Sequence, residues 1–589
     1  MADNPGRIPA HQIAVGAPPL AGPVNNSHPL TETAPARAKV PPQAPPAAEP
    51  KDSLREVVET VVFVVVLVLL LKSFVAEAFV IPTGSMAETL YGYQKWVTCP
   101  KCKFPFPVNC SSEVDPQGEP PTPVVGCTCP NCRYQIDFAQ DFEDESRWPK
   151  WQTGDRVLVG KYFYDLGVEG LNSPQRYQVV VFKYPKQPQK DYTPLNYIKR
   201  MIGLPEETIA IHYGKLYRFT GLNYAEQDRG VPPDDLWKDD YMHKDDAAAL
   251  RLFEQGKFEI LRKGSKQVLA ERRIVYDNDH QATDLKNKID SRWQSARETR
   301  EAWQLNDVAE PTVFRHAPRQ GPEIAWLHYE HLMPDGNRSH ARPELITDFM
   351  GYNTYEKKGQ QRNAPPGNWV GDLMLECDVS IQQPQGQLIF DLSKGIDRFQ
   401  ARFDLASGQC SLIRITNDRE QELDSKPTTI TRAGKHRIRF ANVDERLLVW
   451  VDNALPFAEG VNYPAPNVRG PTIEDLKPAR IGVKSGGVTV SGIKLWRDTY
   501  YTANVDPARQ PDHGGERVDF AQSSTWGPLE HLPVLTMYVQ PNHFLCLGDN
   551  SPESSDGRSW GTVPKRLMLG RALLIYYPFF GPNRVGRIE

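Results

Sequence analysis

An uninterrupted apolar run constrains this chain more than any other feature of its sequence. Val61 to Leu71 are eleven consecutive apolar residues within residues 57–79, VVETVVFVVVLVLLLKSFVAEAF. A helix of about 20 mostly apolar residues crosses a bilayer core, and the flanking Glu59 and Lys72 can reach the headgroups. The run therefore predicts one transmembrane helix over residues 57–79. The alternative is a helix buried in a protein core.

The residues before the run predict no fold. Residues 1–50 hold 12 of the 52 prolines and no apolar period, so we expect a disordered tail. The run comes too late for a secretory signal peptide. Basic residues slightly favour a cytoplasmic N-terminus, with the bulk of the chain outside the plasma membrane. They are Lys39, Lys51 and Arg55 before the run, and Lys72 and Lys95 after it.

Composition excludes several classes of protein. A formal charge of −4 excludes a broadly basic nucleic-acid binder, and we expect no nucleic-acid partner. A mean hydropathy of −0.52 excludes a protein with many membrane spans. Nine cysteines in 589 residues are not a disulfide scaffold, yet six of them lie between Cys99 and Cys132.

Two Cys-Pro-x-Cys motifs account for four of these six cysteines. They place Cys99 with Cys102 and Cys129 with Cys132, and four thiolates can close a tetrahedron around Zn²⁺. We therefore predict a zinc-ribbon-like insert over residues 99–135 that holds a structural zinc ion, with no open position for catalysis. The alternative is a pair of disulfides. The remaining two, Cys110 and Cys127, either pair with each other or bind nothing.

Two stretches alternate apolar and polar residues as β-strands do. In the first, 153–220, Lys199 lies in the apolar segment YIKRMIGLP. A lysine there either snorkels or is buried, and burial would lower its pKa enough for it to act as a base. The second stretch, 367–500, predicts an antiparallel β-sandwich. Between them, 221–366 is a mixed insert of unknown role, with helices predicted over 245–257 and 284–305.

The order of strands in the second stretch resembles a laminin-G/concanavalin-type jelly roll. That resemblance implies a protein or a glycan as the ligand of the β-sandwich. It rests on a pattern and on no specific motif, and a structural role fits equally well.

Four short motifs follow one another in the chain. They are Pro82-Thr-Gly-Ser-Met86, Gly154-Asp-Arg-Val-Leu-Val159, Tyr197-Ile-Lys-Arg200 with Gly203-Leu-Pro205, and Gly548-Asp-Asn550 with Ser554, Asp556, Arg558 and Gly561. In this order they resemble the motifs of the type I signal peptidases, and the resemblance covers residues 57–98, 150–218 and 536–589. Glu88 and Gly557 depart from the family pattern, which has Pro and Ser there.

The resemblance implies a Ser-Lys endopeptidase that removes signal peptides from preproteins at the membrane bilayer. Ser85 would be the nucleophile and Lys199 the general base, which a lysine of lowered pKa can be. The oxyanion would be held by the Ser85 N–H and the Thr83 hydroxyl. Ser554 would orient Lys199 through a hydrogen bond. Catalysis would need no cofactor.

The remaining implied roles are supporting ones. Three charged residues would hold the last motif in place, and three apolar residues would line pockets for small substrate side chains. The first set is Asp549, Asp556 and Arg558, and the second is Phe79, Ile81 and Met86.

The expected architecture is mainly β. A discontinuous peptidase core over 80–98, 150–220 and 536–589 follows the membrane helix. The Cys-rich ribbon and the sandwich-bearing insert would protrude from this core as separate lobes. A non-enzymatic membrane scaffold or receptor is one alternative, although it gives no reason for the intact motifs. A self-cleaving repressor is another, but no helix-turn-helix candidate accompanies it.

Overall fold

The computed structural model describes most of the chain and places it in two units. The units are Met1–Val65 and Val66–Glu589, and the first is described only from residue 53. The described residues are 53–116, 120–161, 174–185, 195–224, 243–297, 301–305, 310–318, 321, 323–359, 367–466, 468–504, 511–514, 517–578 and 584–589. The predicted disordered tail, residues 1–50, lies outside them.

The apolar run forms helix α1, Ser53–Leu70, which ends in a π-helical turn, Leu71–Val75. Among the described residues, no helix is both long and apolar enough to cross a membrane. The transmembrane helix predicted over 57–79 is therefore not supported. Residues 76–79 already belong to strand β1, Ala76–Val80, which pairs with β7, Arg156–Gly160. The plasma-membrane location and its orientation stay predictions.

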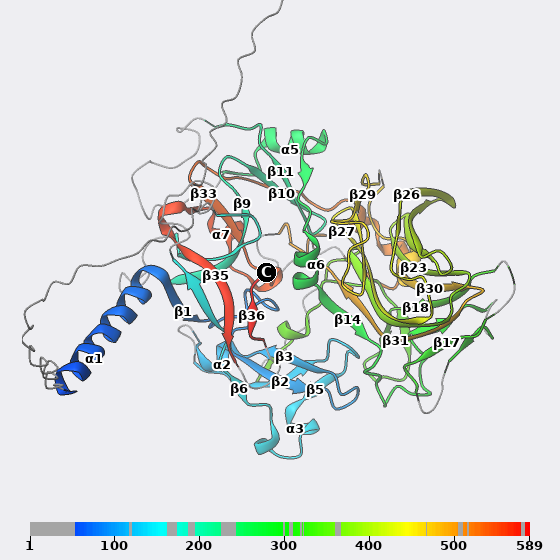
Figure 1. Cartoon of the computed structure of the whole chain (residues 1–589), viewed down its shortest axis with the longest axis horizontal. Helices are drawn as coiled ribbons and strands as arrows, with labels where there is room; N and C mark the ends of the chain where they lie inside the picture. The colour runs from blue at the N-terminus through cyan, green and yellow to red at the C-terminus, as the bar shows by residue number, and fades with distance from the viewer. Residues whose placement is uncertain are drawn as a thin grey trace, which may run out of the picture. The chain divides into compact units, whose positions relative to one another are not determined.

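One antiparallel sheet joins strands from distant parts of the chain (Figure 1). Its inner strand β9 carries Lys199 and lies between β8 and β33, with Val180 opposite Lys199 and Leu547 opposite Arg200. The strands in spatial order are β1, β7, β35 (Met568–Tyr577), β8 (Val179–Lys183), β9 (Asn196–Gly203), β33 (His543–Leu547) and β34 (Val563–Pro564), with β36 (Gly586–Arg587) beside β35.

Both faces of this sheet are buried at strand β8. Successive side chains of a strand point to opposite faces, so Val179 and Val181 of β8 pack in one hydrophobic cluster and Val180 and Phe182 in another. This explains why β8 is an unbroken apolar run rather than an alternating one.

A second sheet shows how the large insert leaves and rejoins the core. Strand β10 pairs with β32, and Ile211 lies opposite Leu535, so the two ends of the insert are neighbours. The strands in spatial order are β12 (His243–Lys244), β32 (Leu535–Tyr538), β10 (Thr208–His212), β11 (Lys215–Phe219) and β13 (Glu259–Ile260).

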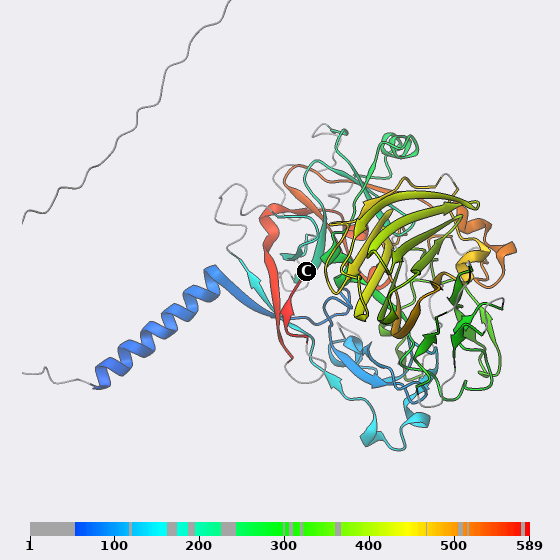
Figure 2. The same cartoon turned by 45° about the vertical axis from the view of Figure 1, so that its right-hand side comes forward.

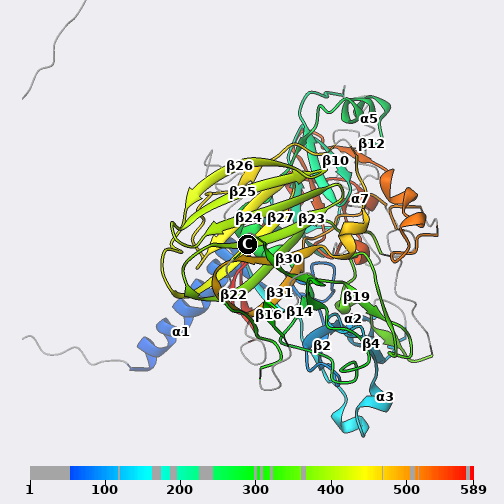
Figure 3. The same cartoon turned by 90° about the vertical axis from the view of Figure 1, so that its right-hand side faces the viewer.

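Two larger antiparallel sheets share one hydrophobic core, and their long strands run side by side in Figures 2 and 3. The first contains β16 (Trp303–Gln304), β17 (Phe314–His316), β31 (Gly487–Arg497), β22 (Leu373–Gln383), β27 (Gly434–Val443), β28 (Arg446–Val451) and β29 (Val461–Asn462), with β14 (Arg273–Asp277) beside β31. The second contains β15 (Trp293–Ser295), β18 (Ala325–Tyr329), β30 (Ala479–Lys484), β23 (Gln387–Lys394), β24 (Asp397–Asp404), β25 (Gln409–Thr416) and β26 (Arg419–Pro427).

These sheets correct two details of the prediction. Strands from the segment assigned to the mixed insert, such as β14 and β18, pair with strands of the predicted sandwich. The helix predicted over 284–305 is absent from its described residues, which contain β15 and β16 instead. Their tryptophans, Trp293 and Trp303, are buried in the shared core, so tertiary packing overrides the charged local pattern. The helix predicted over 245–257 exists as α5, Ala247–Glu254.

Short elements complete the fold. Two small sheets, β3–β2–β6 and β21–β4–β5, carry the cysteine motifs, and β19 pairs with β20. Their bounds are β2 Gln94–Thr98, β3 Pro105–Asn109, β4 Val124–Thr128, β5 Gln135–Asp137, β6 Trp151–Gln152, β19 Leu332–Pro334, β20 Ala341–Pro343 and β21 Glu356–Lys357. The short helices are α2 Ser111–Val114, α3 Phe138–Asp141, α6 Ser265–Glu271 and α7 Gly557–Trp560, with single 3₁₀ turns between other strands. The expectation of a mainly β chain is confirmed.

The large insert is not a separate lobe. Lys215 of β11 lies 2.6 Å from Glu445 and 3.6 Å from Asp372, both in the insert, and all three side chains are buried. At the end of α6, Glu271 lies 3.0 Å from Arg200 of β9, and neither side chain is exposed. Buried charges require their partners, so core and insert depend on each other and the expected independence is wrong.

We therefore expect that replacing residues 225–530 with a short Gly/Ser linker yields an aggregated chain without a cooperative unfolding transition. Removing one partner of a buried ion pair costs about 3–5 kcal/mol, a large share of the roughly 5–15 kcal/mol of a typical domain. Circular dichroism melting and size-exclusion chromatography of the shortened and full chains measure this. A monomeric, cooperatively folded short chain would contradict the interdependence.

Candidate active site

The predicted nucleophile lies in a tight loop directly after β1. Ser85 follows Gly84, where an added Cβ would lie 2.4 Å from the ring of Tyr352, so only glycine fits beneath that ring. The loop is fastened by its backbone: the Ala87 N–H donates to the Gly84 carbonyl at 3.0 Å. The carboxylate of Asp155, from the second motif, accepts from the Tyr91 N–H at 2.8 Å.

Lys199 reaches this loop from strand β9. Its Nζ lies 2.7 Å from Ser85 Oγ and donates to the Ile198 carbonyl at 3.0 Å, and the residue is 3% exposed. Burial lowers the pKa of Lys199 to about 8, although the nearby carboxylate of Asp556 acts in the opposite direction. Residues 114 positions apart thus form a hydroxyl–amine pair of hydrogen-bond length.

The predicted oxyanion donors lie in the same loop. Thr83 and Ser85 are partly exposed. Within the described residues, neither the Thr83 hydroxyl nor the Ser85 N–H takes part in a hydrogen bond. Both groups are therefore free to donate to a negatively charged oxygen.

The predicted hydrogen bond from Ser554 to Lys199 is absent. The Ser554 hydroxyl is buried and has no partner among the described residues. It packs instead against Gly548, where an added Cβ would lie 2.1 Å from Ser554 Oγ and 2.5 Å from the Ser85 carbonyl oxygen. Ser554 is therefore next to the site, but packing against Gly548 rather than bonding to Lys199 fixes its place.

Asp556 and Arg558 form a buried ion pair within the last motif. Their side chains pair at 2.8 Å with 2% exposure or less, and Asp556 also accepts from the Gly548 N–H at 2.9 Å. Burial raises the pKa of Asp556, but the attraction of Arg558 outweighs it and holds that pKa below its usual range. The guanidinium of Arg558 also donates to the Ser551 carbonyl at 2.8 Å.

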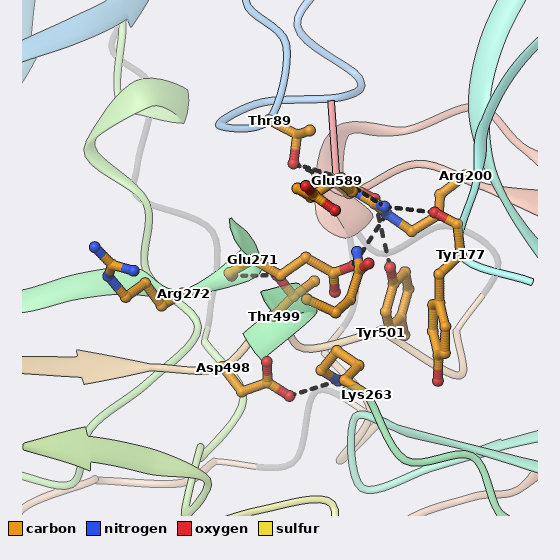
Figure 4. Close-up of polar contacts among 12 residues, drawn as sticks. Thr89, Tyr177, Arg200, Lys263, Glu271, Arg272, Asp498, Thr499, Tyr501 and Glu589 are labelled. Carbon is orange, nitrogen blue, oxygen red and sulfur yellow. Dashed lines mark hydrogen bonds and ion pairs between the residues drawn. The ribbon is translucent and has the colours of Figure 1, made fainter. Parts of the chain in front are cut away.

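Asp549 connects the last motif to the lysine strand through a residue that the sequence did not single out. Arg200 donates from Nη2 to Asp549 at 2.6 Å, and Thr89 of the nucleophile loop donates to the same carboxylate at 2.6 Å. Figure 4 shows Arg200 and Glu271 turned toward each other. Arg200 follows Lys199, so its side chain points to the other face of β9. The position of Arg200 next to Lys199 indicated that the two side chains lie on opposite faces of the strand. Nothing in the sequence around Glu271 indicated a contact with Arg200.

The three residues expected to line substrate pockets divide into two groups. Ile81 and Met86 are 2% and 0% exposed and belong to the hydrophobic cluster behind the loop, so the pocket role predicted for them is not supported. Phe79 packs against the same cluster but keeps exposed surface. Ile81 and Met86 pack inside the protein, so they are not exposed to a substrate.

The four motif cysteines come together. Cys99 Sγ lies 3.6 Å from Cys132 Sγ, and Cys102 Sγ lies 3.6 Å from Cys129 Sγ. All four sulfur atoms lie within 4.8 Å of one another and are buried. Zn–S bonds of about 2.3 Å in a tetrahedron place sulfur atoms about 3.8 Å apart, so the arrangement fits a zinc ion.

The two cysteine turns have the same backbone. Lys103 and Arg133, which directly follow the motifs, both have a left-handed φ, at 60° and 59°. Their N–H groups donate to the carbonyls of Cys99 and Cys129 at 2.9 and 3.0 Å. All nine cysteines are unpaired, so the disulfide alternative, including a bond between Cys110 and Cys127, is absent from this structure.

A second group of acids does not resemble a metal site. Carboxylate oxygens of Asp372, Asp444 and Asp498 lie within 4.8 Å of one another and are buried. The ammonium of Lys263 lies 3.0 Å from Asp444 and 2.8 Å from Asp498 and so supplies the cation.

A cavity of about 620 Å³, including its mouth, lies between β11 and the sandwich strands, and none of its lining residues is a predicted site residue. Trp369, Lys215 and Glu445 are among them. The ligand of the β-sandwich, a protein or a glycan, stays a prediction.

Comparison with known proteins finds similarity to one family of peptidases. A family model, "Signal peptidase, peptidase S26", matches residues 138–264 and 476–577. A signal peptidase I of Pseudomonas aeruginosa is 36% identical over 95 residues, which are 15% of this chain and 32% of the relative. A signal peptidase I of Leptolyngbya laminosa is 34% identical over 102 residues, 17% of this chain and 47% of the relative.

Among solved structures, the carbohydrate-binding module CBM66 of Bacillus subtilis covers 35% of this chain and 95% of its own, at 10% identity and a TM-score of 0.22. A likeness at that score supports no assignment. The chain spans about a third of the length of the first curated relatives that it matches. The resemblance predicted from the motifs is nevertheless confirmed: this chain is similar to the type I signal peptidases.

Proposed function

We propose that this protein is a serine endopeptidase that cleaves signal peptides from preproteins with a Ser85–Lys199 dyad. The observation that carries the proposal is the 2.7 Å contact between Lys199 Nζ and Ser85 Oγ. A buried lysine whose pKa is about 8 is partly neutral near physiological pH, and a neutral amine can accept a proton. The scaffold or receptor alternative gives no reason for this contact.

Acylation begins when neutral Lys199 takes the proton of the Ser85 hydroxyl while Oγ attacks the scissile carbonyl carbon. The carbonyl oxygen becomes an oxyanion, which accepts hydrogen bonds from the Ser85 N–H and the Thr83 hydroxyl. Lys199, now an ammonium, gives its proton to the departing amine. The signal peptide remains bound to Ser85 as an ester.

Deacylation repeats these steps with water. Lys199 takes a proton from a water molecule, the resulting hydroxide attacks the ester, and the proton returns to Ser85 Oγ. Arg200 cannot replace Lys199, because a guanidinium stays protonated and faces the other side of β9. The mechanism requires neither an aspartate–histidine pair nor a cofactor.

Ser85→Ala tests the nucleophile. We expect cleavage of a synthetic signal peptide to fall to background with an unchanged melting temperature, because the substitution removes only one partly exposed hydroxyl. Chromatographic detection of the cleaved peptide measures this. Ser111→Ala, a partly buried serine in α2, is the matched control and keeps full activity. Cleavage by the Ser85 variant at the wild-type rate would remove Ser85 from the mechanism.

The pH dependence tests the base. Only neutral Lys199 accepts a proton, so kcat/KM should rise with pH and level off above a pKa of about 8. Lys199→Arg should be inactive at every pH, because arginine keeps its charge. A steady-state pH profile from acid to alkaline conditions measures both. A flat wild-type profile, or activity in the arginine variant, would exclude a lysine base.

We also propose that Cys99, Cys102, Cys129 and Cys132 bind one structural Zn²⁺. The support is the buried sulfur tetrahedron, and four thiolates leave no position for a substrate or water. The ion would join the end of β2 to the end of β4, which otherwise belong to separate small sheets.

Elemental analysis of the purified protein should give one zinc per chain. Cys129→Ser should lower both the zinc content and the melting temperature, because three thiolates hold the ion less tightly. Cys410→Ser, another fully buried cysteine, is the control and keeps its zinc. A wild-type protein with no zinc and with disulfides in its mass spectrum would favour the oxidised alternative instead.

A further inference from the structure

Asn353, from the large insert, contacts the last motif at the back of the nucleophile loop. Its Nδ2 donates to Asn550 Oδ1 at 2.7 Å, and Asn550 Nδ2 donates to Asn353 Oδ1 at 2.8 Å. The two residues are 4% and 0% exposed, so water does not replace these bonds. They form a closed, reciprocal amide pair.

Asn550 in turn holds the backbone on both sides of the nucleophile. Its Nδ2 donates to the Gly84 carbonyl at 3.0 Å, and its backbone N–H donates to the Ser85 carbonyl at 3.1 Å. Asn550 thus bonds to two consecutive carbonyl groups, and it shares the Gly84 carbonyl with the Ala87 N–H.

The Gly84 bond also sets the direction of a catalytic donor. The Gly84 carbonyl and the Ser85 N–H belong to one planar peptide unit and point in opposite directions. Holding the carbonyl oxygen toward Asn550 therefore aims the Ser85 N–H away from it, toward the side where an oxyanion would be bound. Rotation of this peptide plane would turn that donor away from the oxyanion.

Asn353 completes the hydrogen bonding of the Asn550 amide in the orientation that the Gly84 carbonyl requires. Only the NH₂ end of Asn550 can donate to the Gly84 carbonyl; turned over, its Oδ1 would face another oxygen at that distance. Asn353 donates to Asn550 Oδ1 and accepts from Asn550 Nδ2, so it stabilises the orientation that Gly84 needs. Without Asn353, a buried amide oxygen loses its donor, and the amide loses this restraint.

We infer that Asn353 is a positioning residue of the active site, which acts through Asn550 and the Gly84–Ser85 peptide on the oxyanion-binding N–H. The inference rests on the proposed peptidase function and deepens it. It makes the large insert a contributor to transition-state binding, through a residue that lies outside all four motifs.

Asn353→Ala and Asn353→Asp test this in the full chain. The aspartate variant keeps the size of the side chain but has no N–H to donate, so Asn550 Oδ1 would face a second oxygen. For a signal peptide substrate, we expect kcat to fall about ten- to a hundredfold in both variants, a part of the loss that follows complete removal of an oxyanion donor. KM should stay within about twofold, because the interaction strengthens only in the transition state.

Two further measurements separate positioning from general damage. The inflection of the pH profile should stay at the wild-type value, because Lys199 is untouched. The affinity for a peptide aldehyde, whose adduct with Ser85 carries the oxyanion, should fall in parallel with kcat/KM. Asn368→Ala is the matched control: Asn368 is also a buried asparagine of the insert, bonded to Asp348 at 2.9 Å, and its removal should lower stability but not kcat.

The outcomes of these experiments test the role of Asn353 separately from the proposed peptidase function. If wild type cleaves the peptide and the Asn353 variants match it, or if Asn368→Ala loses kcat equally, the inference is wrong and the proposed function stands. A shifted pH inflection would mean that Asn353 acts on Lys199 instead and would also overturn it. If wild type does not cleave, the proposed function fails. Crystal structures of wild type and Asn353→Ala then decide, and an unmoved Gly84–Ser85 peptide contradicts the inference.

Discussion

Two neighbouring cations on strand β9 have opposite environments, and the chemistry of the site depends on that difference. Arg200 is paired with the carboxylates of Asp549 and Glu271 and has no exposed surface. Burial lowers its pKa, but the two carboxylates outweigh that and raise it above the usual range. Lys199 is equally buried, yet its nearest polar partners are a hydroxyl and a carbonyl, and its pKa falls. One strand thus holds one permanent charge and one exchangeable proton.

The sequence predicts the parts of the site that lie within short motifs. Ser85, Lys199, Asp556 and Arg558 are predicted because their motifs resemble those of the type I signal peptidases, and each motif is a short turn or strand. The hydrogen bond expected from Ser554 did not follow, because its hydroxyl packs on Gly548. The motif predicted that Ser554 lies near the site, but it did not predict which group the Ser554 hydroxyl contacts.

The features of the site that the sequence did not predict depend on contacts between residues far apart in the chain. Glu271 and Asn353 reach the site from an insert with no recognisable motif, and no local pattern encodes a partner 197 residues away, as Asn550 is from Asn353. The apolar run led to a helix that was predicted to end at residue 79, but the helical residues end at Val75 because residues 76–79 pair with β7. Local hydrophobicity indicated a helix, and tertiary pairing set where it ends.

The position of β35 has a consequence for the order in which the protein assembles. Strands β7 and β8 do not pair with each other. Strand β35 lies between them in the sheet and pairs with both, although it follows them by about 400 residues in the chain. Strand β33, the other neighbour of β9, also follows the insert. The sheet that carries the lysine therefore stays open on the ribosome until residues 543–577 have been made. Strands that are this far apart in the sequence pair slowly. The Ser85–Lys199 dyad is therefore among the last features to form, after the insert has begun to fold.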